Sequence, residues 1–120
     1  MLINLSNHPY SLWGDRQKKA AAAYGVTVDL PFPSVAPDAD EEEIGDLADL
    51  YLERVLGMGA AESFTVHIMG EQTLCFALIS RLHRLGIQCI ASCAARDVTM
   101  QPDGHKLVNF NFIRFRKYTL

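Results

Sequence analysis

The chain alternates short apolar or β-branched segments with helix-forming segments, and this alternation limits its fold more than any other feature. Strands are predicted at residues 2–5, 26–30, 64–69 and 87–91. Because a helix between two strands returns the chain to the same edge of a sheet, this order indicates right-handed crossovers around parallel strands. The predicted fold is α/β, with a three-layer, Rossmann-like, mostly parallel sheet.

Three helices are predicted between these strands. The first covers residues 13–24, with Ser11 as its cap and Gly25 as its stop. The second covers residues 40–56 and has one apolar stripe, and the third covers residues 71–85.

After residue 91 the helical period disappears, and an antiparallel β-hairpin is expected. Residues 98–100 and 107–115 are its strands, and the Asp-Gly pair at residues 103–104 is a strong turn signal. A chain of 120 residues suits one domain. We therefore expect a single domain over residues 1–120, with a hairpin extension at about residues 97–117.

Charge is unevenly distributed although the net charge is only −3. Residues 38–56 contain eight acids and one base, whereas residues 105–120 contain four bases and no acid. An anionic partner is therefore allowed on the last strand. Basic residues also protect sheet edges from pairing, so binding of long nucleic acid is not expected.

The cysteines indicate a reducing, cytoplasmic setting. There are three of them without a Cys-x-x-Cys pair, and Cys75 and Cys89 fall in apolar segments. No segment approaches the ~18 apolar residues that span a bilayer, and the first residues do not resemble an export signal, so no membrane partner is expected. Neither histidine spacing nor a glycine-rich fingerprint suggests a metal or a nucleotide cofactor, and we expect none.

Polar residues follow the first and third strands. If the strand order is 2-1-3-4, the loop at residues 6–8 and the turn at residues 70–73 border the crevice where such sheets bind ligands. Backbone N–H groups at the start of the third helix can bind an anion, and a glycine lets a backbone approach closely. The expected ligand contacts in these two segments are Ser6, Asn7, Gly70, Gln72 and Thr73.

Several other side chains have two interpretations. His8 can protonate a leaving oxygen or simply face solvent, and Glu71 can act on a hydroxyl or compensate the helix dipole. Ser92 and Arg96, expected at the end of the fourth strand, can contact an anion, although Arg96 can also face Asp97 and solvent.

Three further residues have structural interpretations as their default. His67 is expected to be a hydrogen-bonded core histidine. Trp13 and Phe32 can stack on a base, but by default they cover the end of the sheet.

Four segments resemble a known family: Leu-Ile-Asn-Leu-Ser-Asn-His, Val-Asp-Leu-Pro-Phe-Pro, the acidic helix and Val-His-Ile-Met-Gly-Glu-Gln-Thr. Over roughly residues 1–95, but not the hairpin, the chain resembles small stand-alone CRISPR-associated Rossmann-fold (CARF-like) proteins. Some of these resemble ring nucleases, which degrade cyclic oligoadenylate second messengers of type III CRISPR antiviral defence. The resemblance implies a homodimer that binds the cyclic RNA across its two-fold axis. It also implies metal-independent cleavage, with a ribose 2′-hydroxyl attacking its own phosphate.

Transferred to this chain, the resemblance implies three groups of site residues. Ser6 and Asn7 match the polar loop after strand one, and Gly70, Gln72 and Thr73 match the phosphate cradle. His8 and Glu71 are the candidates for proton transfer, and Arg96 for charge stabilisation. The chain departs from the family in having no Lys or second Arg in the loops after strands one and three.

Two other classes of function fit the sequence. A non-catalytic module would either bind the second messenger without cleaving it or interact with another protein. In the latter case it would dock a basic partner on the acidic helix, and binding would fail when residues 41–43 are neutralised. A small hydrolase using Glu71 with Mg²⁺ would depend strictly on added metal.

Overall fold

The computed structural model describes the backbone of residues 1–120 and every side chain except that of Ala61. Its single sheet has the strand order β2-β1-β3-β4-β5. The strands are β1 (Leu2–Ser6), β2 (Thr27–Pro31), β3 (Thr65–Ile68), β4 (Cys89–Met100) and β5 (Lys106–Lys117). Strands β1 to β4 pair in parallel and β5 pairs antiparallel with β4. The predicted α/β class, the mostly parallel sheet, the terminal hairpin and the order 2-1-3-4 are confirmed.

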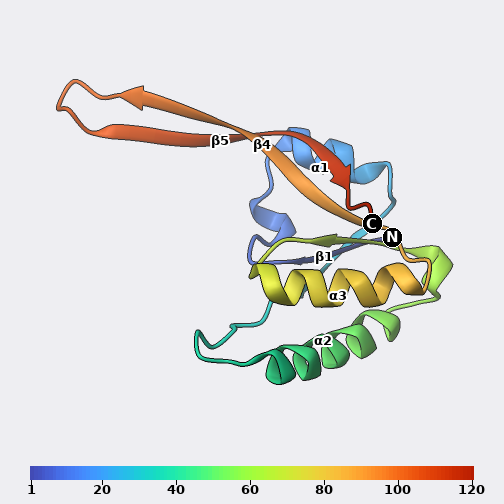
Figure 1. The fold of residues 1–120 in the computed structure, drawn as a ribbon. Coiled ribbons are helices and arrows are strands. Elements are labelled where there is room, and N and C mark those ends of the chain that lie inside the picture. Colours follow the sequence, from blue (N-terminus) through green and yellow to red (C-terminus); the bar gives the residue numbers. More distant parts are fainter.

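Helices lie on both faces of the sheet. Figure 1 shows α1 (Asp15–Ala22) on one face and α2 (Glu41–Leu56) and α3 (Gln72–Arg84) on the other. Short 3₁₀ turns, η1 (Tyr10–Leu12) and η2 (Ala61–Ser63), precede α1 and β3. Because β1 lies between β2 and β3, with helices on both faces of the sheet, all five of its residues are buried. No helix in the described part of the chain combines the length and apolarity needed to cross a membrane.

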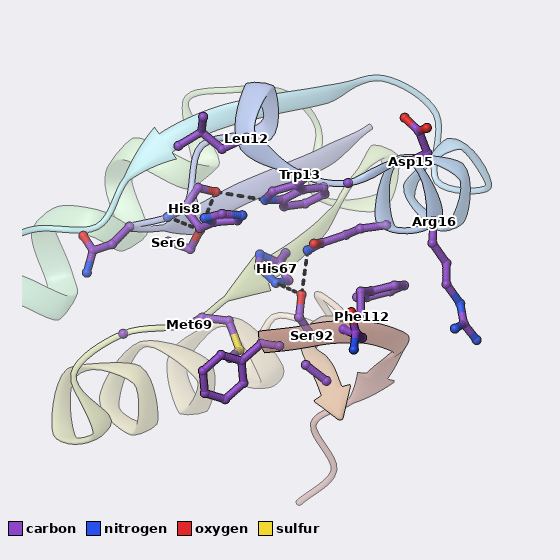
Figure 2. Close-up of a pocket in the computed structure, with 17 residues that line it drawn as sticks. Ser6, His8, Leu12, Trp13, Asp15, Arg16, His67, Met69, Ser92 and Phe112 are labelled. Carbon is purple, nitrogen blue, oxygen red and sulfur yellow. Dashed lines mark hydrogen bonds between the residues drawn. The ribbon is translucent and has the colours of Figure 1, made fainter. Parts of the chain in front are cut away.

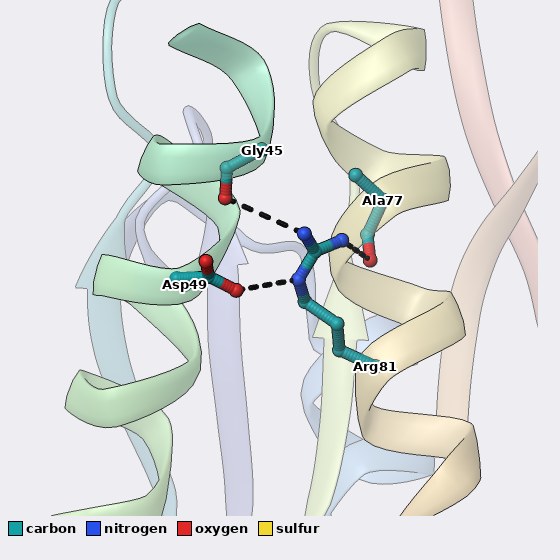
Figure 3. A network of polar contacts seen from close by, with 4 residues as sticks. All are labelled: Gly45, Asp49, Ala77 and Arg81. Carbon is teal, nitrogen blue, oxygen red and sulfur yellow. Dashed lines mark hydrogen bonds and ion pairs between the residues drawn. The ribbon is translucent and has the colours of Figure 1, made fainter. Parts of the chain in front are cut away.

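Helices α2 and α3 pack on each other and are linked by the polar contacts of one arginine. Arg81 on α3 donates through Nε to Asp49 Oδ1 at 2.8 Å and through Nη1 to the Ala77 carbonyl at 2.9 Å (Figure 3). The carboxylate is mostly exposed, so this ion pair contributes about 1 kcal/mol at most. Burial therefore dominates this layer, with Ala48, Val55, Leu74, Leu78 and Leu82 completely inaccessible to solvent.

The first helix is shorter than expected, and Ser11 does not cap it. Residues 10–12 form η1 instead, and the backbone of Trp13 is extended. The Trp13 indole is buried and donates to the His8 carbonyl at 2.9 Å, which holds this residue outside the helix. Gly14 is therefore the residue at the N-cap of α1, and it offers no side chain to the helix.

The fourth strand is much longer than expected. Predicted to end at residue 91, it continues to Met100, because β5 pairs with it from Ile90–Lys117 to Met100–Lys106. Ser92 and Arg96 therefore lie within β4 and not in a loop after it. A bulge between Cys93 and Ala94 shifts the register beside Ser92.

The far half of the hairpin extends beyond the rest of the molecule (Figure 1). The radius of gyration is 16.0 Å, whereas a compact chain of this length has about 14 Å. Directly opposed residues of an antiparallel pair point to the same face. One face of the hairpin, which we call the arm face, therefore carries the pairs Ala94–Phe112, Arg96–Phe110, Val98–Val108 and Met100–Lys106.

Candidate functional site

A cavity of about 990 Å³ opens beside the carboxyl ends of β1 and β3. Its wall combines the loop after β1, the start of α1, the end of β3 and the near part of the hairpin (Figure 2). Strand order reverses between β1 and β3, the position where open α/β sheets bind ligands. The volume lies near the upper end of the roughly 300–1,000 Å³ typical of small-molecule sites.

Five of the expected site residues meet in this cavity. They are Ser6, Asn7, His8, Gly70 and Ser92. Gln72 lines a neighbouring cavity of about 560 Å³ on the α3 side, which shares Met69 and Gly70 with the first. Glu71, Thr73 and Arg96 line neither, so the polar segments after β1 and β3 adjoin without forming one continuous surface.

Glu71 occupies the position where a phosphate was expected. Its carboxylate accepts hydrogen bonds from the Thr73 and Leu74 backbone N–H groups, at 3.1 and 2.8 Å, and from the Thr73 hydroxyl at 2.6 Å. The Thr73 hydroxyl, followed by these N–H groups, keeps the pKa of Glu71 below its ordinary value. The start of α3 is thus satisfied by the chain's own carboxylate, while proton transfer by Glu71 stays a prediction.

Gly70 has a packing reason to be glycine. A Cβ at this position would lie 2.5–2.6 Å from the ring carbons of Phe32, which no real contact allows. Phe32 is buried, so it covers the end of the sheet, in agreement with its default interpretation.

The start of α1 faces the cavity without a capping side chain, a feature that the sequence did not indicate. Residues 14–17 line the cavity, and no side chain caps the helix. The first N–H groups of a helix lack intrahelical acceptors and carry partial positive charge. Arg16 adds a full charge to the same wall, opposed by Asp15.

A hydrogen-bonded array of buried polar residues lies against the cavity. His67 Nδ1 is 2.9 Å from Asn4 Oδ1, and His67 Nε2 is 2.6 Å from Ser92 Oγ. Gln17 Nε2 donates to the same Ser92 oxygen at 3.0 Å (Figure 2). Asn4 and His67 are 1% and 2% exposed, which confirms the expected core histidine. Burial, and secondarily the positive potential of His8, lower the pKa of His67 to about 4.

Sequence analysis did not single out Asn4, Gln17 or the cavity role of His67. Asn4 and His67 are register partners on β1 and β3, and each interrupts an otherwise aliphatic strand. A polar residue in the middle of a buried strand was the available signal. That Asn4 and His67 are partners could be known only from the strand register, which places them side by side.

Aromatic side chains complete the wall. The Trp13 ring packs edge-on to His67 with centroids 5.3 Å apart, and Phe112 packs edge-on to Phe115 at 4.9 Å. Phe110 also lines the cavity, and its side chain is largely exposed. Flat apolar surfaces therefore border the polar groups contributed by β1, β3 and α1.

Comparison with known proteins gives one match. A protein-family model described as "Uncharacterized protein MJ1673 family" matches residues 1–116. The chain belongs to this family. The match extends through nearly all of β5, so the hairpin is part of the family's domain together with the cavity. No curated protein and no solved structure matches the chain.

In this family member, the residues that line the cavity define the chemistry it can support. Within the described residues, no three His, Cys, Asp or Glu side chains group as they would around a metal ion. What the cavity offers is an uncapped helix start, an arginine, one exposed and one buried histidine, a serine hydroxyl and aromatic walls.

Proposed function

We propose that this protein binds a cyclic oligoadenylate in the cavity and cleaves it without metal, as a ring nuclease of type III CRISPR antiviral signalling. The fold would be Rossmann-like, of the CARF type that the sequence resembles. The observation that carries the proposal is the convergence of residues 6–8, the uncapped start of α1 and Ser92 where the strand order reverses.

The start of α1 supports binding of phosphate groups. A phosphodiester there would meet free N–H groups and the partial positive charge of the helix end. Arg16 can add charge-assisted hydrogen bonds to a phosphate oxygen. The phosphate contact is thus assigned to α1, because Glu71 already fills the start of α3.

The aromatic walls support binding of adenine. Proteins hold unstacked bases against aromatic faces, and each such stack is worth about 1–3 kcal/mol. Phe110, largely exposed at the cavity rim, and Phe112 are the available faces, and Trp13 forms the floor beside His67.

The proposed reaction is attack of a ribose 2′-hydroxyl on the adjacent phosphorus. The 2′-oxygen–phosphorus bond forms and the bond from phosphorus to the 5′-oxygen breaks, leaving a 2′,3′-cyclic phosphate and a 5′-hydroxyl. The protein's part is to position the phosphate and to move protons. His8, exposed in the cavity wall, is the group proposed to protonate the leaving 5′-oxygen.

We further propose that two copies associate through the arm face. This surface is mainly apolar, with Arg96 and Lys106 as its two charged residues, and it projects from the body of the molecule. A monomer rarely leaves a large apolar patch open. Ala94, Phe110 and Phe112 belong both to the arm face and to the cavity wall. A second copy on this face would therefore enlarge the same cavity, as a cyclic ligand on a two-fold axis requires.

The test is incubation of purified protein with cyclic tetra-adenylate in EDTA, followed by chromatography of the products. Linear products ending in a 2′,3′-cyclic phosphate are expected. A variant with Gln at positions 41–43 is the control, and should cleave at the wild-type rate because these residues lie on α2, outside the cavity. Cleavage that requires added metal would overturn the mechanism, and absence of binding at about 100 μM would overturn the function.

A further inference from the structure

The hydrogen bonds of Asn4 fix which way its amide points. Its Nδ2 donates to Asp29 Oδ1 at 2.8 Å and to the backbone oxygen of His8 at 2.9 Å. A carboxylate and a carbonyl can only accept, so both amide hydrogens are used on them. The amide oxygen therefore faces Ser6 Oγ, at 2.8 Å, and His67 Nδ1, at 2.9 Å.

This orientation determines the tautomer of His67. An amide oxygen only accepts, so Nδ1 carries the ring hydrogen and the neutral ring leaves Nε2 as an acceptor. The hydroxyl of Ser92 must then donate to Nε2 across their 2.6 Å separation. Gln17 Nε2 donates to Ser92 Oγ at 3.0 Å, so the hydroxyl hydrogen is aimed at the histidine while the oxygen remains on the cavity wall.

An oriented histidine next to a hydroxyl is the arrangement that moves protons in many enzymes. A third group, here Asn4, holds the ring in the productive tautomer. Burying this array carries a desolvation cost that an aliphatic pair at Asn4 and His67 would avoid.

We propose that Ser92 and His67 together take the proton from the attacking ribose 2′-hydroxyl, an inference that rests on the proposed cleavage. Ser92 contacts the substrate and is the catalytic residue. His67 acts through it, and Asn4 positions His67. This assigns the base of the reaction to residues of β3 and β4, and leaves His8 as the acid.

The proton transfer balances without any added reactant. The 2′-hydroxyl gives its hydrogen to Ser92 Oγ as Ser92 gives its own hydrogen to His67 Nε2. The electron pair freed on the 2′-oxygen forms the bond to phosphorus, and the 5′-oxygen leaves with a proton from His8. Water returns both histidines to their starting states after the product departs.

The pH dependence separates this pair from an ordinary histidine base. Because the pKa of His67 is about 4, its Nε2 remains available well below neutrality. Charged groups around the ring are His8 from the loop after β1, Asp29 through Asn4, and Asp15 and Arg16 across the cavity. A cleavage step that uses His67 as its base should lose no rate as the pH falls from 7 to about 5, because His67 remains an acceptor and a lower pH keeps the acid His8 protonated. A base with an unperturbed histidine pKa of about 6.5 would slow within that range.

The experiment measures single-turnover cleavage and binding of cyclic tetra-adenylate by the wild type, Ser92→Ala, Ser92→Thr and the exposed control Ser34→Ala. We expect Ser92→Ala to bind within about threefold of wild type but to cleave at least about 100-fold more slowly. Ser92→Thr keeps a hydroxyl and should recover most of the rate, and Ser34→Ala should match the wild type. The wild-type rate should not decrease as the pH falls from 7 to 5.

Each other outcome has a definite meaning. Ser92→Ala cleaving at the wild-type rate would overturn this inference and leave the proposed function intact. A wild-type rate that falls as the pH drops below about 6.5 would overturn the role of His67. Binding without cleavage by the wild type would overturn the inference together with the proposed cleavage, and no binding at all would overturn the whole proposed function.

Discussion

Gly70 is a residue whose identity follows from one contact. The Phe32 ring occupies the space where a Cβ would lie, so Gly70→Ala should force a backbone or ring shift. Overpacking of this kind costs about 1–3 kcal/mol. We expect a decrease of that size in the free energy of unfolding, measured by urea denaturation.

Substitution of a second glycine should change the free energy of unfolding in the opposite direction. Gly45 lies within α2, and a Cβ there would meet only the Arg81 guanidinium at 3.6 Å, an ordinary contact. Gly45→Ala should therefore stabilise the protein by about 0.5–1 kcal/mol through helix propensity. Equal effects at the two positions would contradict the packing explanation for Gly70.

His67 makes stability depend on pH in a defined window. Its pKa is about 4 in the folded chain against an ordinary value of 6.5. The unfolded chain thus binds the proton more tightly, so this contribution is complete above about pH 6.5 and is lost as the pH falls toward 4. The loss approaches roughly 3 kcal/mol at most.

Urea unfolding at pH 7, 6, 5 and 4 measures the slope of the free energy of unfolding against pH. His67→Gln should flatten it, whereas His83→Gln, at an exposed position of α3, should retain it. If the His67 variant keeps the full wild-type slope, another group is responsible.

At the same scale, local sequence could predict part of the site. Ser6 ends β1 and Asn7 and His8 follow it, so their place beside the cavity depends only on where the strand ends. Asn4 and His67 could not be joined from sequence, because their contact depends on the register of β1 against β3.

At the scale of elements, the starts of α1 and α3 have exchanged their expected roles. Glu71 caps α3, and Gly14 leaves α1 uncapped at the cavity. We predict that Glu71→Ala lowers the melting temperature but leaves binding of cyclic tetra-adenylate within about threefold of wild type.

Glu71→Gln is the companion variant. It keeps an acceptor oxygen for part of the cap, so it should lose less thermal stability than the alanine variant. If either variant folds and binds normally but no longer cleaves, the expected role of Glu71 in proton transfer would be restored.

Element boundaries were predicted well where the signal is local. Asp40 caps α2 through the Glu43 N–H at 2.9 Å, and Gly86, with a positive φ of 74°, directly follows the C-cap of α3. The expected stop of the first helix was less accurate, because α1 ends at Ala22 and Gly25 lies three residues further on. The length of β4 could not be predicted from the local sequence. Residues 92–97 lack strong strand character and become a strand because β5 pairs with them.

For the whole molecule, the arm face predicts the oligomeric state. Two chains of 13.4 kDa should elute and scatter as one dimer at micromolar concentration. Val98→Asp combined with Val108→Asp places two charges on opposed positions of the arm face and should give a monomer.

The control is a matched pair of changes on the other face of the hairpin. Thr99→Asp with Asn109→Asp should leave the dimer intact, because both residues point away from the arm face. A wild-type monomer, or equal dissociation by both pairs, would contradict the proposed association.

If the cavity beside β1 and β3 binds the cyclic anion, a tryptophan in its wall should report the binding by a change in fluorescence. Trp13 is the single tryptophan and lies in the cavity wall. Its fluorescence should change saturably as cyclic tetra-adenylate is added, with a Kd below about 100 μM, and Arg16→Ala should weaken binding by about tenfold or more. Unchanged Trp13 fluorescence at saturating ligand, or an Arg16→Ala titration identical to that of the wild type, would contradict the account.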